Sequence, residues 1–331
     1  MTLTPSNTRP LKPVITDAQN TAMFRLAEQF DQLAKGSRQV PKAPVDSHLK
    51  HLIQDKSIIE YHDILIRESG PLFKHFLASV PYILEELCRV GVAISRHVTS
   101  FEKAGDSNFS FLEADAFDGS NARTLASLSQ GMISTLTTSP NKSNQIYFEK
   151  FKNPAISCFF PRSILELTPA MLQNDPYKEF SQGFDFIYEM AAFQFYDKDR
   201  SRQIKHLKKL LKPGGIVFFL EKLNHSDTEE YFHRERIKDD KFKCRYFTRE
   251  EIQWKQNQML EHMQSGQVGL SDLVQKIRDN FRYAYLIWNS TNFYEILASD
   301  DQTKIQSLMK QFGPTIQPDG FCFEQSIIGP L

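Results

Sequence analysis

Apolar and polar positions follow two different periods along the chain. Up to about Val98, apolar residues recur at helical spacing, and a first helix is predicted around Phe24–Ala34, ending at the GSRQVPKAPVDS segment. Asp46 and Ser47 are predicted to cap a second helix, and the stretch from Ile83 to Ile94 carries the apolar face of a third. These patterns predict an α-helical N-terminal region.

After Gly105, short apolar runs alternate with amphipathic stretches, which is the pattern of βαβ units around a parallel sheet. Five strands are predicted, at Phe109–Glu113, Met132–Thr137, Ala155–Phe160, Phe184–Glu189 and Ile216–Glu221. Two further β-rich runs, RYAYLIWNS and NFYEILAS, meet at Ser290-Thr291 and predict a terminal hairpin. We therefore expect an α/β fold.

The same pattern divides the chain into four parts. Residues 1–15 are polar and contain proline, and we expect a flexible arm there. Residues 16–104 are predicted to form a helical cap or lid, or an oligomerisation region. Residues 105–225 and 281–331 make up the predicted α/β core, and residues 226–280 a charged helical insertion before the hairpin.

The most specific segment is GFDFIYEMAAFQFYDKDRSRQIKHLKKLLKPGGIVFFLEKL, residues 183–223. Asp185 begins a strand, an amphipathic helix follows, and Pro-Gly-Gly turns the chain into a further parallel strand. This segment resembles the fourth strand, fourth helix and fifth strand of the class I S-adenosylmethionine (SAM) methyltransferases. Taken with the predicted hairpin, the resemblance covers about half of the chain and implies a Rossmann-like sheet that binds SAM.

The resemblance also implies a cofactor loop after the first strand, where FLEADAFDGSNARTLA stands. Glu113 and Gly119 occupy the family's acidic position and its third glycine, whereas Asp115 and Phe117 replace the first two glycines. Glycines there let the backbone approach the cofactor without a Cβ clash. The Phe117 ring would lie where the cofactor usually lies, and Asp115 would add negative charge beside the SAM carboxylate.

Two other cofactor positions are implied by the same alignment. Thr137 stands where the family commonly ends its second strand with an acid that binds the ribose hydroxyls, and a hydroxyl accepts hydrogen bonds less strongly than a carboxylate. Tyr188 stands among the residues that line the space between cofactor and substrate. SAM binding would therefore depend on Glu113, Asp115, Phe117, Gly119, Thr137 and Tyr188.

Two residues near the carboxyl ends of strands are candidates for catalysis. Glu189 could act as a general base or hold a substrate amine, and it could equally cap or pair a neighbouring segment. His225 is the histidine best placed to accept a proton, although a surface or helix-capping role fits it as well. No spacing of histidines or carboxylates predicts a metal site.

Composition limits the classes of partner. The 40 basic and 40 acidic residues give zero formal net charge, so no general attraction to nucleic acid or an anionic membrane is expected. No apolar run is long enough to span a bilayer, and no signal peptide is evident. Four scattered cysteines suggest reduced thiols and a cytoplasmic protein. The partners we expect are a small-molecule substrate and, as an option, a second copy of the chain.

Three functions stay open at this point. The first is a SAM-dependent methyltransferase that methylates an oxygen or nitrogen of a small-molecule metabolite. The second is a methyltransferase-like scaffold that no longer binds SAM and acts as an interaction or regulatory protein. The third is an enzyme of other chemistry that uses Asp115 or Asp118 in the same pocket. The direction of the Phe117 ring discriminates between them: a ring in the crevice blocks the cofactor, and a ring turned into the core leaves room.

Overall fold

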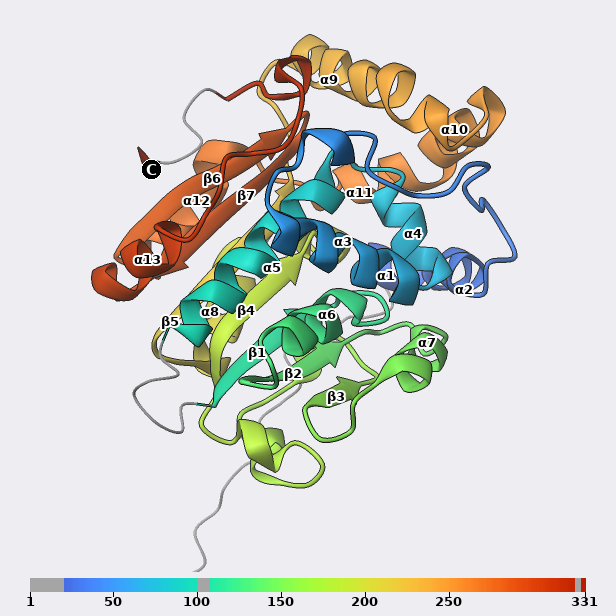
Figure 1. Ribbon diagram of the computed structural model, residues 1–331. Helices are drawn as coiled ribbons and strands as arrows, with labels where there is room; N and C mark the ends of the chain where they lie inside the picture. The colour runs from blue at the N-terminus through green and yellow to red at the C-terminus, as the bar shows by residue number, and fades with distance from the viewer. Residues whose placement is uncertain (1–20, 101–107, 325–328) are drawn as a thin grey trace, which may run out of the picture.

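The computed structural model describes residues 21–100, 108–324 and 329–331; the expected arm at residues 1–15 lies outside these ranges. One eight-stranded sheet forms the centre, in the order β3-β2-β1-β4-β5-β7-β6-β8 (Figure 1). Its strands are β1 Phe109–Ala114, β2 Ile133–Thr138, β3 Ser157–Phe160, β4 Phe184–Met190, β5 Leu211–Lys222, β6 Tyr283–Ser290, β7 Phe293–Ser299 and β8 Gly329–Pro330. The five predicted core strands and the terminal hairpin are confirmed.

Strands β1 to β5 are parallel, and β7 pairs with β5 in the antiparallel direction. Glu113 of β1 lies between Thr137 of β2 and Tyr188 of β4. The chain order of the sheet reverses between β1 and β4, and in open α/β sheets the crevice at the carboxyl ends of such strands is where ligands bind. The α/β prediction is confirmed, and the strand order with an antiparallel β7 is that of the class I methyltransferase fold.

The LKPGG segment differs from its prediction as a turn. It is the irregular beginning of β5, with a shift of register against β4 between Phe184 and Phe186. Gly214 has a φ of 69°, a left-handed conformation that glycine adopts without a steric penalty. The two glycines thus form a bulged entry into the strand.

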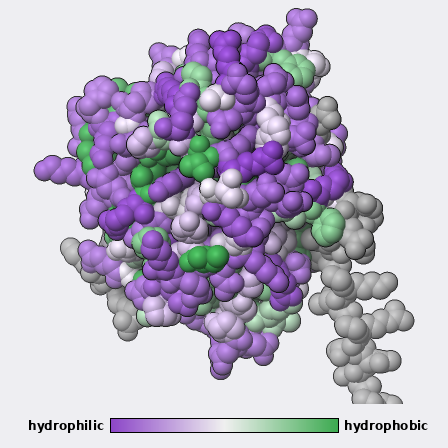
Figure 2. Space-filling view, turned by 90° about the vertical axis from the view of Figure 1, so that its right-hand side faces the viewer, coloured by the Kyte–Doolittle hydropathy of each residue, from purple (hydrophilic) through white to green (hydrophobic). Residues whose placement is uncertain are grey.

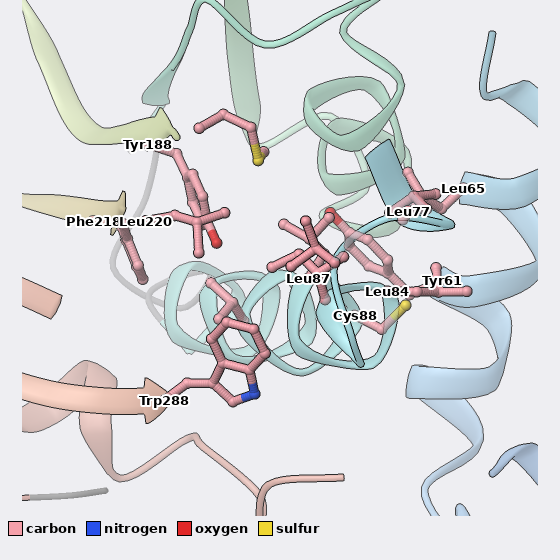
Figure 3. Packing of buried hydrophobic residues seen from close by; sticks show 14 of the residues in the cluster. Tyr61, Leu65, Leu77, Leu84, Leu87, Cys88, Tyr188, Phe218, Leu220 and Trp288 are labelled. Atoms are coloured by element: carbon pink, nitrogen blue, oxygen red, sulfur yellow. The ribbon is translucent and has the colours of Figure 1, made fainter. Parts of the chain in front are cut away.

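Helices cover both faces of the sheet. On one face lie α3 Lys56–Glu68, α5 Ile83–Thr99, α6 Ser120–Leu128 and α13 Gln302–Met309, and on the other α8 Arg200–Leu210 and α12 Leu270–Arg278. The remaining helices are α1 Ala22–Arg25, α2 Ala27–Ala34, α4 Pro71–Leu77, α7 Asn144–Phe151, α9 Thr228–Lys241, α10 Arg249–Lys255 and α11 Glu261–Gln264. Figure 3 shows Leu84 and Leu87 of α5 between Tyr61 of α3 and the sheet residues Tyr188 and Trp288.

The predicted start of the second N-terminal helix is wrong. The helix is α3, which begins at Lys56 with the Asp55 carboxylate as its N-cap. Asp46 and Ser47 do not cap it because a separate 3₁₀ turn, Lys50–Leu52, lies between them and α3. The Ser47 hydroxyl oxygen accepts from the Leu49 N–H at 3.2 Å before that turn, and the hydroxyl donates to the buried Glu85 carboxyl group.

The insertion is helical, as predicted, and it packs on the N-terminal region. The Lys42 N–H donates to the Tyr246 carbonyl at 2.8 Å, the Gln39 amide donates to the Glu251 carbonyl at 3.1 Å, and both contacts join segments some 200 residues apart. Figure 1 shows α9 and α10 on the same side of the molecule as α4, beyond the carboxyl ends of the strands. The two helical additions together form a roof over the edge of the sheet where ligands bind.

The outer surface of this roof is mainly polar. Figure 2 looks onto the side of the molecule that carries α2, α4 and α7, and hydrophobic residues show there only in small groups. Among the helices in the described part of the chain, none has both the length and the apolar character needed to cross a membrane.

Candidate functional site

Three neighbouring cavities follow the carboxyl edge of the sheet. The lysine cavity, about 770 Å³, lies at the ends of β4 and β5 beneath α4 and the insertion. The loop cavity, about 390 Å³, lies at Asp115 and Phe117, and the outer cavity, about 880 Å³, lies between α1, Asn141 and Tyr196. Phe30 of α2 lines all three, so the N-terminal helices divide a single groove into compartments.

The β1–α6 loop keeps a glycine-like backbone although two of its glycine positions are filled by other residues. Asp115, Phe117 and Gly119 have φ values of 52°, 55° and 71°. A left-handed conformation costs a residue with a side chain on the order of 1–2 kcal/mol. The surrounding fold therefore imposes the conformation on this loop.

The Asp115 carboxylate is held by three donors. It accepts hydrogen bonds from the Ile164 N–H at 2.8 Å, the Thr138 hydroxyl at 2.9 Å and the Tyr196 hydroxyl at 2.5 Å, and the Tyr196 oxygen in turn accepts from the Ser163 hydroxyl at 2.7 Å. Burial raises the pKa of Asp115 to about 6, and the hydrogen bond from Tyr196 is the largest of the opposing effects. The carboxylate thus ties the loop to the segments that follow β3 and β4.

The Phe117 ring turns toward the N-terminal helices. It stacks on Phe73 of α4, with ring centroids 5.1 Å apart and 17° between planes, and lies 4.9 Å from the Phe76 ring. The ring lines both the loop cavity and the lysine cavity. Phe117 therefore forms part of the wall between two compartments instead of entering the sheet's core.

Glu113 and Gly119 support the loop from beneath. The buried Glu113 carboxyl group accepts from the Asn121 amide at 2.7 Å and from the Ala122 N–H at 3.3 Å, and burial raises its pKa to about 8. A Cβ on Gly119 would lie 2.5 Å from the Thr137 hydroxyl oxygen, so only glycine fits there. Thr137 is fully buried, and its hydroxyl has no hydrogen-bond partner among the described residues.

Tyr188 lies away from the cavities. Its ring stacks on Phe218 at 5.3 Å and faces α5 in the core (Figure 3). Burial and the neighbouring Glu295 raise the pKa of its phenol well above the usual range. The expectation that Tyr188 contacts the cofactor is corrected, because β4 turns this side chain to the face that α5 covers.

Glu189 and His225 lie outside the three cavities. The fully buried Glu189 carboxyl group accepts from the backbone N–H of Ala192 at 2.5 Å and of Phe193 at 3.1 Å, and it lines none of the three cavities. Burial, and then repulsion from Glu221, raise its pKa well above the usual range. His225 lies in the turn before α9, where its Nδ1 contacts the backbone of Asp227 at 3.0 Å.

The loop fits SAM in its backbone and departs from it in two side chains. The left-handed backbone is kept, but at the start of α6 the Ser120 and Ala122 N–H groups are already bound by the Asp118 and Glu113 carboxyl groups. The Asp115 carboxylate and the Phe117 ring line the loop cavity, and Thr137 is covered where a ribose acid would be exposed. Asp115, Phe117 and the Asn141 side of the groove are what a cofactor could contact.

The most polar feature of the site was missed by the sequence analysis. Lys222, Lys238, Lys243 and Lys255 line the lysine cavity from β5 and the insertion. A lysine at the end of an apolar strand, as in IVFFLEKL, was the available signal for a buried amine. The described residues contain no group of three or more histidines, cysteines or carboxylates arranged to hold a metal ion.

Comparisons with known proteins bear on the fold alone. No family model matches the chain, and no curated protein does. Among solved structures, the plantazolicin methyltransferase BpumL, in complex with a triazolic desmethylPZN analogue and SAH, is 15% identical, with 81% of this chain and 95% of that chain covered at a TM-score of 0.44. An O-methyltransferase structure from Nostoc punctiforme, itself described as putative, is 11% identical over 74% and 69% of the two chains, at a TM-score of 0.40. At TM-scores below 0.5 these similarities support no argument about function, and the assignment of the fold class rests on the strand order.

Proposed function

We propose that this protein is a SAM-dependent methyltransferase that acts on a small molecule held in the lysine cavity. SAM supplies the methyl group when bound, and the residues of this chain hold and orient the acceptor and exclude water. The fold class and the groove along its carboxyl edge support the proposal, although fold alone does not fix function.

The observation that carries the proposal is the backbone of the β1–α6 loop. Asp115 and Phe117 keep left-handed φ values at two positions where a side chain makes this conformation costly. Strained backbone that the surrounding structure maintains tends to occur at ligand sites. The surrounding fold holds this loop in a conformation that would bring its backbone close to a cofactor.

A second candidate function is a methyltransferase-like scaffold that does not bind SAM, or one that binds another ligand in the same groove. The network around Asp115 favours it, because three protein donors already satisfy that carboxylate at the wall of the loop cavity. A SAM molecule would have to place its own carboxylate near this charge.

Titration calorimetry with SAM and with S-adenosylhomocysteine tests the proposal. We expect both to bind with micromolar dissociation constants, and Asp115→Gly to tighten binding at least fivefold because it removes a charge beside the ligand carboxylate. Asp319→Gly, at an exposed position, is the matched control and should leave the affinity unchanged. If neither the wild type nor Asp115→Gly binds SAM at millimolar concentration, with or without a small molecule in the lysine cavity, the result would favour the scaffold function.

A further inference from the structure

Four lysine amines converge on one side of the lysine cavity. Lys222 ends β5, Lys238 lies in α9, Lys243 follows that helix, and Lys255 ends α10. The first three are at most 4% exposed. The described residues that line the cavity include these four amines and no aspartate or glutamate.

Two carboxylates behind the cavity wall neutralise part of this charge. Glu235 lies 2.9 Å from the Lys222 amine and also contacts Lys238. Asp239 lies 2.9 Å from the Lys243 amine. Both carboxylates also accept from side-chain amides, Glu235 from Asn292 and Asp239 from Gln256. Two carboxylates therefore face four lysine amines.

Lys255 is the amine without an acidic partner among the described residues. Its Nζ lies 2.6 Å from Nε2 of His75 and 3.0 Å from the Ser79 hydroxyl. Because the other ring nitrogen of His75 lies 3.1 Å from the Gln39 carbonyl, which can only accept, Nδ1 carries the proton and Nε2 accepts from Lys255. Both contacts of Lys255 are thus neutral acceptors.

The uncompensated charge is costly for the protein. Burial, followed by the neighbouring lysines 243 and 238, lowers the pKa of Lys255 well below its usual range. Burial, followed by Lys238, lowers the pKa of Lys243 to about 8. An anionic group placed between these amines would favour their charged forms and satisfy N–H donors that point into the cavity.

Apart from the lysines and the polar residues His75, Ser79, Gln194 and Gln256, the cavity wall is apolar. Its side chains come from α4, from the segment after β4, from the start of β7 and from the insertion, and include Leu72, Phe76, Met190, Phe195, Met259 and Phe293. Gln256–Leu260 forms a π-helical turn directly after Lys255, and such turns occur often at functional sites. Methionine side chains in such a wall adapt to the shape of a ligand.

We infer that the lysine cavity binds a small amphipathic oxyanion, a molecule with an apolar body and a carboxylate or phosphate group, whose charge lies between Lys243 and Lys255. The apolar body occupies the space between α4, Met190 and Phe293. That the bound oxyanion is also the methyl acceptor rests on the proposed function. That the cavity binds an oxyanion does not depend on it.

Calorimetry with a matched series of ten-carbon ligands, without SAM, tests the binding. We expect decanoate or decyl phosphate to bind at least tenfold more tightly than decanol and decylamine, and the two anions distinguish a carboxylate site from a phosphate site. Equal binding of the alcohol, the amine and the anions by the wild type would overturn the inference, whatever the variants do.

Variants locate the anionic group. Lys243→Met and Lys255→Met should each weaken binding of the preferred anion at least tenfold and change decanol affinity less than twofold. Lys209→Met, at an exposed position on α8, is the matched control. Lys255→Arg should retain most of the anion affinity. Unchanged anion affinity in folded Lys243→Met and Lys255→Met proteins would also overturn the inference. Since SAM is absent, a failure of SAM binding would leave these outcomes unaffected.

Discussion

The carboxylate of Asp115 and the phenol of Tyr196 are joined by a hydrogen bond of 2.5 Å across the carboxyl edge of the sheet. Asp115 stands at the first glycine position of the β1–α6 loop, and Tyr196 follows β4 by six residues. The same phenol also contacts the Ser163 hydroxyl at 2.7 Å, after β3. Three strand ends that could move independently are therefore linked through one buried carboxylate.

Removing the Tyr196 hydroxyl should loosen this link. Tyr196→Phe keeps the ring and deletes a donor to a buried carboxylate, so the free energy of unfolding should fall by roughly 1–3 kcal/mol. Urea denaturation measures the change. Tyr177→Phe is the matched control, because its hydroxyl makes a single 3.3 Å bond to the Phe159 carbonyl from a half-buried position, and it should cost less than about 1 kcal/mol. Equal costs for the two variants would contradict the special role of the Asp115 contact.

The left-handed conformation of Phe117 predicts an unusual order of stability. Alanine and glycine at this position both lose the ring stacking on Phe73, but glycine adopts a φ of 55° without strain. Phe117→Gly should therefore be about 1 kcal/mol more stable than Phe117→Ala. At Phe76, inside α4, the order should reverse by about the same amount, because glycine weakens a helix. Chemical denaturation of the four variants checks both orders, and the same order at both positions would argue against the strained loop.

The sheet could be predicted because its signals are local. Each strand has a short apolar run, and a bulge at Gly214 or a shift of an end by one residue leaves that pattern intact. The helix start at Asp46 failed because only the 3₁₀ turn Lys50–Leu52 follows it, and the backbone is extended at Ile53 before α3 begins at Lys56. A polar residue that can cap looks the same in the sequence whether a helix or a single turn follows it.

The candidate site was predictable only where the fold constrains the backbone. The alignment of the loop located Asp115, Phe117 and Gly119, and all three have left-handed φ values. The sequence has no local signal for the packing that turns Tyr188 to one face of β4. It also has none for the hydrogen bond from the Ala192 N–H to the Glu189 carboxylate. The lysines escaped notice because they come from separate elements and meet only in three dimensions.

Glu113 should make stability depend on pH. Its pKa is raised from about 4.5 to about 8, so the folded state holds the proton more tightly than the unfolded chain does. Its contribution is therefore fully present at low pH and is lost as the pH rises from about 4.5 through about 8. Relative to the wild type, Glu113→Gln should gain roughly 2–4 kcal/mol between pH 5 and pH 8. Thermal unfolding across this range measures the change, with exposed Glu60→Gln as the control; a constant difference between Glu113→Gln and the wild type would contradict the prediction.

The ion pair of Arg200 and Glu221 should show strong coupling. Both side chains are fully buried beneath α8, with Nε of Arg200 2.7 Å from the Glu221 carboxylate. Glu221→Gln leaves a buried guanidinium with a neutral partner and should lower the free energy of unfolding by roughly 3–5 kcal/mol.

Replacing both partners, as Arg200→Met with Glu221→Gln, should cost clearly less than the sum of the two single replacements, because no charge is then left uncompensated. Urea denaturation of the single and double variants completes the cycle. The exposed pair Arg162 and Glu166, 3.8 Å apart, provides the matched cycle and should give a coupling below about 1 kcal/mol. A coupling energy of the buried pair no larger than that of the exposed pair would contradict the prediction. It would indicate that water reaches Arg200 beside α8.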